Sequence, residues 1–226
     1  MKTKTNFLKI TFALILGLIL LSKDIFGQSN YKIFVAISPL SVIDYKDGSS
    51  FRPSIEFRAK NSYSFAFESG IYLNSFSNFF SYKANVNGFL FKPTLKYYFK
   101  PHKNKSSSYI GVEYQFKSQK YDLNDSIKIN GVIFQKDYFL KRRVNCLSVK
   151  YGQVKLIKKK FLMEWFAGIG IRFLSSSSSL TNVEYEGILR GEKYYNNTGG
   201  GYTARIIGDK ILPNFVLGLK FGYKIK

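Results

Sequence analysis

The last fourteen residues, PNFVLGLKFGYKIK, alternate between apolar side chains and small or polar ones. A two-residue period is that of an extended strand, because successive side chains point to opposite faces, whereas a helical face repeats every 3.6 residues. The segment therefore predicts an amphipathic strand, long enough to cross a bilayer as a tilted strand of roughly 9 to 11 residues. Its apolar face carries Pro213, Phe215, Leu217, Leu219, Phe221, Tyr223 and Ile225.

Seven earlier segments repeat this alternation, so the sequence predicts eight strands. The sixth segment is the least regular, since its phase slips near Gly152 and Gln153, where we expect a β-bulge. An even number of strands lets an antiparallel sheet close with both chain ends on one side. The predicted fold is all-β, an eight-stranded antiparallel up-and-down transmembrane β-barrel. The strands are expected at residues 31–39, 51–59, 65–73, 89–99, 110–117, 138–157, 163–173 and 213–225.

The polar faces of these strands combine small residues with charges of both signs. A solvated surface has no need of glycine, whereas a narrow lumen requires small residues, and charges buried there must be paired. We therefore expect the charged side chains to point into the barrel and to form a structural ion-pair network. Its predicted members are Arg52, Glu56, Arg58, Glu68, Lys92, Lys96, Glu113, Lys150, Glu164, Arg172 and Lys220.

Two other barrels are compatible with the same alternation. A secreted or periplasmic ligand-binding barrel of the calycin type would turn its apolar face inward and its charges into water. The glycine-rich polar face favours the membrane form, and a basic residue facing lipid at the midplane would cost about 2 to 4 kcal/mol. The second alternative is a narrow pore that passes anions along the basic lumen, although eight-stranded barrels usually have a filled interior.

Residues 1–27 have the features of a secretory signal peptide. A basic leader of three lysines precedes an almost wholly apolar run at residues 10–21, and Gly27 supplies a small residue at the expected cleavage point. The apolar run is shorter than the ~20 residues that a transmembrane helix needs. We expect residues 28–226 to form one outer-membrane barrel domain, since a chain of 226 residues suits a single domain.

The lengths of the connections predict which side of the membrane each barrel end faces. Periplasmic turns are short and extracellular loops are long in bacterial barrels. The expected short turns are residues 60–63, 100–108 and 158–160, and the expected extracellular loops include residues 74–88, 118–137 and 175–212.

Aromatic residues are expected in two roles. The last long connection is rich in tyrosine, which suits it to recognition of an extracellular partner. Its candidate partner-binding residues are Tyr185, Tyr194, Tyr195 and Tyr202. Aromatic side chains near strand ends are expected to form interfacial girdles. These are Tyr97, Tyr98, Phe99, Tyr109, Trp165, Phe173 and Tyr223.

The formal charge of +21 raises the question of a nucleic-acid partner. The basic residues alternate with apolar ones or gather in turns, rather than lining one helix or one stacking platform, and an exported chain rarely meets nucleic acid. We therefore expect no nucleic-acid partner. Anionic lipid head groups and lipopolysaccharide account better for the charge.

The sequence offers little for catalysis or for metal binding. The single histidine, His102, lies in a predicted turn, away from any nucleophile that it could activate. Cys146 is the only cysteine, so an intrachain disulfide is excluded. The inward glutamates stand among arginines and lysines, which favours ion pairing over acid–base chemistry. We expect a non-enzymatic protein with no catalytic, cofactor-binding or metal-ligating residues.

Two acidic segments are the nearest approach to a calcium site. Asp44 and Asp47 lie in DYKDG, and Asp122 and Asp125 lie in DLND. Both segments hold too few oxygen ligands for a recognised calcium loop. We expect ordinary turn chemistry to explain their composition.

Several phrases resemble small outer-membrane β-barrel proteins of Gram-negative bacteria, of the OmpA-like or OmpX-like kind. They are SIEFR, FAFESG, IGVEY, LMEWFAGIGIR and the terminal PNFVLGLKFGYKIK. The resemblance covers nearly all of the expected mature chain and is specific for architecture rather than activity. It implies insertion by the outer-membrane assembly machinery, location in the outer membrane, and a structural or surface-recognition role through long extracellular loops. One departure is that such barrels often end in an aromatic residue, whereas this chain ends in Lys226.

Overall fold

The computed structural model describes residues 32–43, 48–59, 62–74, 84–99, 106–157, 160–189 and 207–225. The expected signal peptide therefore lies outside the described residues. The strands are β1 (Lys32–Ile37), β2 (Ser50–Phe51), β3 (Pro53–Arg58), β4 (Tyr63–Tyr72), β5 (Ala84–Tyr98), β6 (Ser106–Ile129), β7 (Val132–Leu156), β8 (Phe161–Ser178) and β9 (Gly208–Lys224). Two short helices, η1 (Pro39–Ser41) and α3 (Asn182–Glu186), complete the described elements. Among the described residues, no helix is long and apolar enough to cross a membrane.

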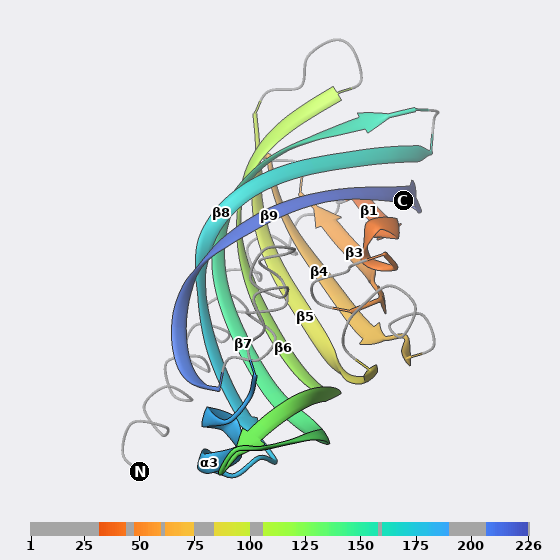
Figure 1. The fold of residues 1–226 in the computed structure, drawn as a ribbon. Coiled ribbons are helices and arrows are strands. Elements are labelled where there is room, and N and C mark those ends of the chain that lie inside the picture. Colours follow the sequence, from red (N-terminus) through yellow and green to blue (C-terminus); the bar gives the residue numbers. More distant parts are fainter. Residues whose placement is uncertain are drawn as a thin grey trace.

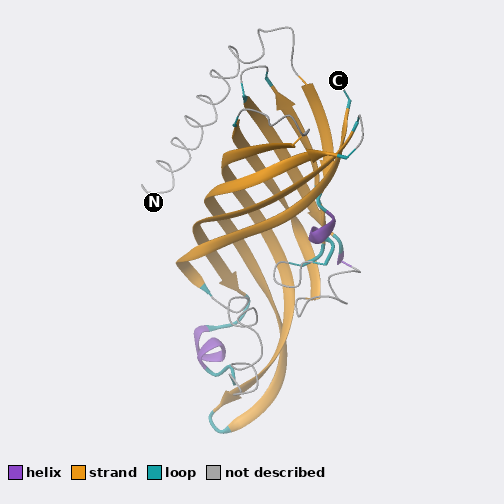
Figure 2. Cartoon of the chain, turned by 90° about the horizontal axis from the view of Figure 1, so that it is seen from above, coloured by secondary structure: helices purple, strands orange, loops and turns teal. Residues whose placement is uncertain are grey.

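The strands hydrogen-bond in a closed antiparallel ring (Figure 1). Each strand pairs with its neighbours along the chain, and β1 closes the ring by pairing with β9. Both β2 and β3 pair with β4, so they are one strand that is interrupted at Arg52. The ring therefore contains eight strands in up-and-down order, which confirms the predicted fold. Figure 2 shows the strands tilted around the barrel.

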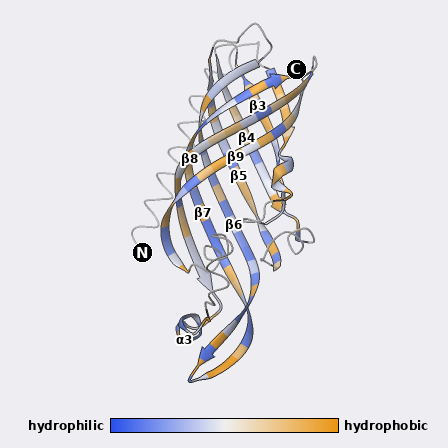
Figure 3. Cartoon of the chain, turned by 45° about the horizontal axis from the view of Figure 1, so that its top comes forward, coloured by the Kyte–Doolittle hydropathy of each residue, from blue (hydrophilic) through white to orange (hydrophobic). Residues whose placement is uncertain are grey.

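The apolar face of each strand points out of the barrel, and the mixed polar face points into it. On β7, for example, Leu147 and Val149 are exposed outside, while Ser148 and Lys150 are buried inside. The most exposed of the large apolar side chains are Leu217 at 82% and Phe215 at 80%. Bands of apolar and polar residues alternate along the strands in Figure 3. This orientation is the one predicted for a membrane barrel, and it contradicts the soluble alternative, which requires apolar residues inside.

Several strands are longer than predicted. We expected residues 118–137 to form a loop, but residues 118–129 belong to β6 and residues 132–137 to β7. The hairpin turns at Asn130 and Gly131, which have φ angles of 50° and 84°. Positive φ at both positions is the signature of a tight Asn-Gly hairpin turn, so this connection was wrongly assigned as a loop. Similarly, β8 runs on to Ser178, within the expected loop at 175–212.

The expected β-bulge at Gly152 and Gln153 is absent. β7 keeps an unbroken register with β6 and with β8 through these residues. The apparent slip in phase arises because Val154 is apolar and yet points inward, where it is buried. The described register shift lies instead between β5 and β6, near Ala84 and Asn87.

Val154 belongs to an apolar floor that closes the lumen at the end with the short connections. Tyr98 and Tyr109 also belong to this floor, although we expected both in an outer aromatic girdle. Tyr98 and Tyr109 are buried and face inward, so their assignment to the girdle was wrong. The other expected girdle residues are exposed on the outer face, namely Tyr97, Phe99, Trp165, Phe173 and Tyr223. The floor consists of Phe34, Tyr98, Tyr109, Val154, Leu162 and Phe166.

Two floor aromatics lie directly on glycines of the adjacent strand. Tyr109 is the register partner of Gly152, and a Cβ added there would lie 2.5 Å from the tyrosine ring. Phe166 covers Gly218 in the same way, at 2.2 Å. Only a residue without a side chain permits such a close approach.

We predict that Gly152→Val destabilises the barrel by about 1 to 3 kcal/mol, because the new side chain must displace the buried Tyr109 ring. The free energy of unfolding can be measured by urea titration in detergent micelles. Ala167→Val is the matched control, since Ala167 is exposed on the outer face, and it should change stability by less than about 0.5 kcal/mol. Equal effects of the two substitutions would contradict the packing described for Tyr109.

Candidate functional site

The inward polar face carries a network of ion pairs. Lys96 lies between two carboxylates, with its Nζ 2.7 Å from Glu56 and 2.8 Å from Glu164. The hydroxyl of Tyr98 donates a hydrogen bond of 2.8 Å to Glu56, and that of Tyr109 donates to Glu164. The Tyr98 hydroxyl binds the Glu56 oxygen that Lys96 leaves, while Tyr109 and Lys96 share one oxygen of Glu164, so the network and the floor form one unit.

Two further glutamates are held by lysines from other strands. Glu68 on β4 accepts Lys220 of β9 at 2.6 Å and Lys92 of β5 at 3.2 Å. Glu113 on β6 accepts Lys150 of β7 at 2.6 Å, and Lys150 is only 1% exposed. Lys92 and Lys150 come from the strand next to that of their glutamate, whereas the Lys220–Glu68 pair joins β9 to β4 across the lumen and therefore forms only when the ring is closed.

The predicted arginines occupy the edges of this network. Arg58 donates to Glu56 at 3.0 Å and stacks on the Tyr98 ring, with its guanidinium carbon 3.9 Å from the ring centroid. Arg52 hydrogen-bonds Ser50, and Arg172 hydrogen-bonds Asn214. All eleven residues expected in the lumen therefore lie on the inward face.

Other inward polar residues were not among the predicted network. Lys117 and Arg142 are buried on the same face, towards the end with the long connections. The signal that could have identified them is the two-residue period, which continues along β6 and β7 well past residue 117. Lys117 and Arg142 lie within the strands that we predicted at residues 110–117 and 138–157, so the same alternation places both inward.

The lumen space within the network is very small. The cavity lined by Glu56, Lys96, Glu164 and Lys220 has a volume of about 10 Å³. A volume of this order accommodates one water molecule. Packing at this level therefore argues against the narrow anion pore.

The described residues contain no group of three histidine, cysteine or acidic side chains that could hold a metal ion. Asp122 and Asp125 lie in β6, not in a turn as expected, and they accept hydrogen bonds from Asn85 and Tyr138. His102, Asp44 and Asp47 lie outside the described residues.

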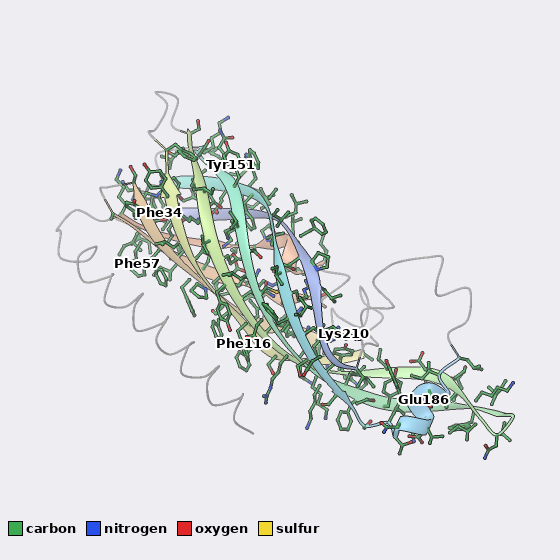
Figure 4. The ribbon with its side chains drawn as sticks, turned by 90° about the vertical axis from the view of Figure 1, so that its left-hand side faces the viewer. Phe34, Phe57, Phe116, Tyr151, Glu186 and Lys210 are labelled. Atoms are coloured by element: carbon green, nitrogen blue, oxygen red, sulfur yellow. The ribbon has the colours of Figure 1, made fainter. Side chains whose placement is uncertain are left out.

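A second feature stands beyond the barrel wall. Residues 121–140 of the β6–β7 hairpin, here called the arm, extend past the last pairing of β7 with β8 at Leu140 (Figure 4). The inward side of the arm carries an apolar core of Tyr121, Leu123, Ile127 and Tyr138, which is continuous with buried apolar residues of β4 and β5 in the barrel wall.

Helix α3 covers this core. Thr181 caps its first turn and forms a reciprocal capping box with Glu184. Lys136 on the arm forms an ion pair with Glu184, and this hydrogen bond lowers the pKa of the Glu184 carboxyl below its usual value. After the helix, Gly187 accepts a hydrogen bond of 2.8 Å from Lys128, and Leu189 donates one of 2.9 Å to Ser126. The segment that follows α3 thus adds to the edge of β6.

Of the four tyrosines proposed to bind a partner, Tyr185 lies in the described part of the chain. Tyr185 lies on α3 and packs, half-buried, against the core of the arm rather than offering its ring to a partner. Tyr194, Tyr195 and Tyr202 lie outside the described residues. The exposed apolar side chains at the tip of the arm are instead Val132, Ile133 and Phe134.

We predict that Lys150→Met lowers the free energy of unfolding by about 3 to 5 kcal/mol, because it leaves the Glu113 carboxylate buried without its cation. The double variant Glu113→Gln, Lys150→Met should lose less than the sum of the two single variants, since no unpaired charge remains. Urea unfolding in micelles measures all three. Lys155→Met, which changes an exposed lysine on the same strand, is the control and should have an effect below about 0.5 kcal/mol. A Lys150→Met variant as stable as this control would show that the pair is not needed.

Comparison with known proteins gave matches among solved structures. No protein-family model and no curated protein matches the sequence. The N-terminal β-barrel domain of OprF from Pseudomonas aeruginosa is similar at 12% identity and a TM-score of 0.36, over 86% of this chain and 96% of that one. A major outer membrane protein from Thermus thermophilus is similar at 11% identity and a TM-score of 0.40, over 86% of this chain and 98% of that one. The resemblance to small outer-membrane barrels that the sequence motifs indicated is confirmed for the architecture, by the closed ring of eight strands.

Proposed function

We propose that this chain is an integral outer-membrane β-barrel whose lumen is structural and whose arm is presented at the cell surface. The observation that carries the proposal is the belt of apolar side chains around the barrel. On β8 and β9 it includes Trp165, Ile169, Phe215 and Leu217, all exposed. Soluble monomers rarely expose contiguous apolar patches larger than a few hundred Å². Lipid tails are the environment that such a belt requires.

The shape of the outer surface also fits a lipid environment. An open apolar hollow with a volume of about 540 Å³ lies on the outer face of β1, β3 and β9. Val35, Ile55 and Phe221 are among the residues that line it. Acyl chains can fill this hollow, whereas water in the hollow would be in contact with apolar side chains.

The two ends of the barrel differ in a way that supports an orientation. Short connections join β3 to β4 and β7 to β8 at one end, where Lys32 and Ile225 also lie. The arm and α3 lie at the opposite end (Figure 1). Short turns are periplasmic and long extensions are extracellular in bacterial barrels, which places the arm outside the cell in this proposal.

A non-enzymatic role is supported by the state of the inward carboxylates. Each of Glu56, Glu68, Glu113 and Glu164 forms an ion pair with a lysine at 3.2 Å or less. Carboxylates held in this way stabilise the wall. The proposed partners are outer-membrane lipid and lipopolysaccharide around the belt, the outer-membrane assembly machinery during insertion, and an extracellular partner at the arm.

Cell fractionation tests the proposal directly. The protein should appear in the outer-membrane fraction, and an unheated sample should migrate differently from a boiled one in gel electrophoresis, because the closed barrel resists detergent. A protein found in the aqueous fraction without detergent would overturn the proposal.

We predict that Leu217→Arg reduces the stability of the barrel in lipid vesicles by about 2 to 4 kcal/mol, since it places a charge in the belt. Urea titration, followed by the loss of the heat-modifiable band, measures the effect. Glu186→Arg is the control, because Glu186 is exposed on α3 beyond the belt, and it should be nearly neutral. If both variants unfold alike, the belt is not in contact with hydrocarbon.

We predict that a cysteine at Ile133, at the tip of the arm, reacts with a membrane-impermeant maleimide on intact cells. Ile133 is 59% exposed, while the native Cys146 is 1% exposed and should give little background. Ile157→Cys is the matched control, at 55% exposed beside a short connection, and it should react only after the membrane is permeabilised. Labelling with the opposite preference would reverse the proposed orientation.

A further inference from the structure

We propose that Lys120, Lys141 and Arg143 form a binding site for the phosphate groups of the outer-leaflet glycolipid, the lipid A part of lipopolysaccharide. This inference rests on the proposed function, since it assigns a lipid partner to one position on the outer face of the same barrel.

The three cations lie side by side on the outward face of β6 and β7. Lys120 is the register partner of Lys141, and Arg143 is the next outward residue along β7, opposite Ser118. All three are exposed. Register partners in an antiparallel pair have Cβ atoms roughly 4.5 to 5.5 Å apart, and diagonal neighbours remain within reach of long side chains. The three head groups can therefore meet one phosphate.

The two lysines are held together despite their like charge. Like charges directly opposite each other destabilise a strand pair. Here the ring of Phe139 lies under both, with its centroid 4.5 Å from the Lys120 nitrogen and 5.6 Å from the Lys141 nitrogen. Cation–π contact of this kind keeps the ammonium groups beside the ring. The pair is thus arranged before any anion arrives.

The three cations are not neutralised by an ion pair, although Asp122 lies next to them as the register partner of Phe139. Within the described part of the chain, none of the three cations forms an ion pair with an acidic residue. The acids on the same outward face are Asp122 and Asp137, which accept hydrogen bonds of 2.8 Å from Asn85 and 2.6 Å from Asn124, and Asp209, which is opposite Ser175 on β8. An external anion is therefore the natural partner of the cluster.

Position along the strands identifies the anion as a lipid phosphate. The apolar belt ends just below the cluster, at Phe116 on β6, Leu147 on β7 and Phe173 on β8. Figure 4 places Phe116 where the barrel wall gives way to the arm. A lipid whose acyl chains lie along the belt would bring its head group level with Lys120 and Arg143. Arginine and lysine together bind phosphate oxygens well, with the guanidinium group as a bidentate donor.

The end of the strands at which the cluster lies selects the leaflet. The cluster lies at the end that carries the arm, which is the extracellular end in the proposed orientation. The outer leaflet of the outer membrane carries phosphate on the sugars of lipid A. A cluster at the opposite end would face periplasmic phospholipid instead.

The test compares two triple variants of the mature protein in nanodiscs of phosphatidylcholine, titrated with fluorescent lipid A. Lys120→Gln, Lys141→Gln, Arg143→Gln removes the cluster. Lys32→Gln, Lys155→Gln, Lys160→Gln removes the same charge from exposed lysines at the other end. We expect the first variant to bind lipid A about a hundredfold more weakly than the wild type, because each basic residue near an anionic surface contributes several-fold to affinity. The second should bind within about threefold of the wild type.

Two further arms define what is bound. Lipid A from which both phosphates have been removed should bind the wild type as weakly as lipid A binds the first variant. Inorganic phosphate at millimolar concentration should not displace lipid A. Equal binding of the two triple variants, equal binding of dephosphorylated lipid A, or full displacement by inorganic phosphate would each overturn the inference. Fractionation and heat modifiability of the first variant should match the wild type, which separates a failure of this site from a failure of the proposed membrane location.

Discussion

Pairing of buried lysines with buried glutamates across the lumen is the interaction that holds the wall in one arrangement. A buried charge without its partner costs several kcal/mol, and each of these pairs joins different strands. Lys96 of β5 reaches Glu56 of β3 on one side and Glu164 of β8 on the other. The first of these contacts passes over β4, where the small Ser64 is the register partner of Lys96. No single hairpin can bring both carboxylates to Lys96, so this part of the network favours complete closure over any partly formed sheet.

The barrel architecture could be predicted from the sequence because lipid and lumen impose opposite demands on alternating residues. The alternation predicted which face of each strand points to lipid and which points into the lumen. The arm could not be predicted in the same way, because its outward face contacts water. Asp122, Asn124 and Lys128 are polar there, so the composition of the segment resembles that of a loop. Asn130-Gly131 is a local signal of a hairpin within these polar surroundings.

The members of the lumen network were predictable, but their partners were not. Periodicity places Glu113 and Lys150 on the inward face, but it does not fix the stagger between strands. This stagger decides which charged side chains come together. For the floor residues, it was the direction of the side chain that the sequence did not reveal. Tyr98 and Tyr109 alternate in the phase of the polar residues, yet their rings fill space while their hydroxyl groups donate to carboxylates. An amphipathic side chain can satisfy both demands, so the type of residue alone did not reveal its direction.

The strand edge of the arm has a consequence for how neighbouring molecules behave. A hairpin that projects beyond its sheet exposes rows of free amide and carbonyl groups, which can recruit a strand from another copy. Residues 187–189 occupy the β6 side of this hairpin through backbone hydrogen bonds at Ser126 and Lys128. Helix α3 therefore does more than cover apolar side chains. Because it leads the chain back along the β6 edge, α3 lets residues 187–189 block edge-to-edge aggregation among closely spaced barrels at that edge.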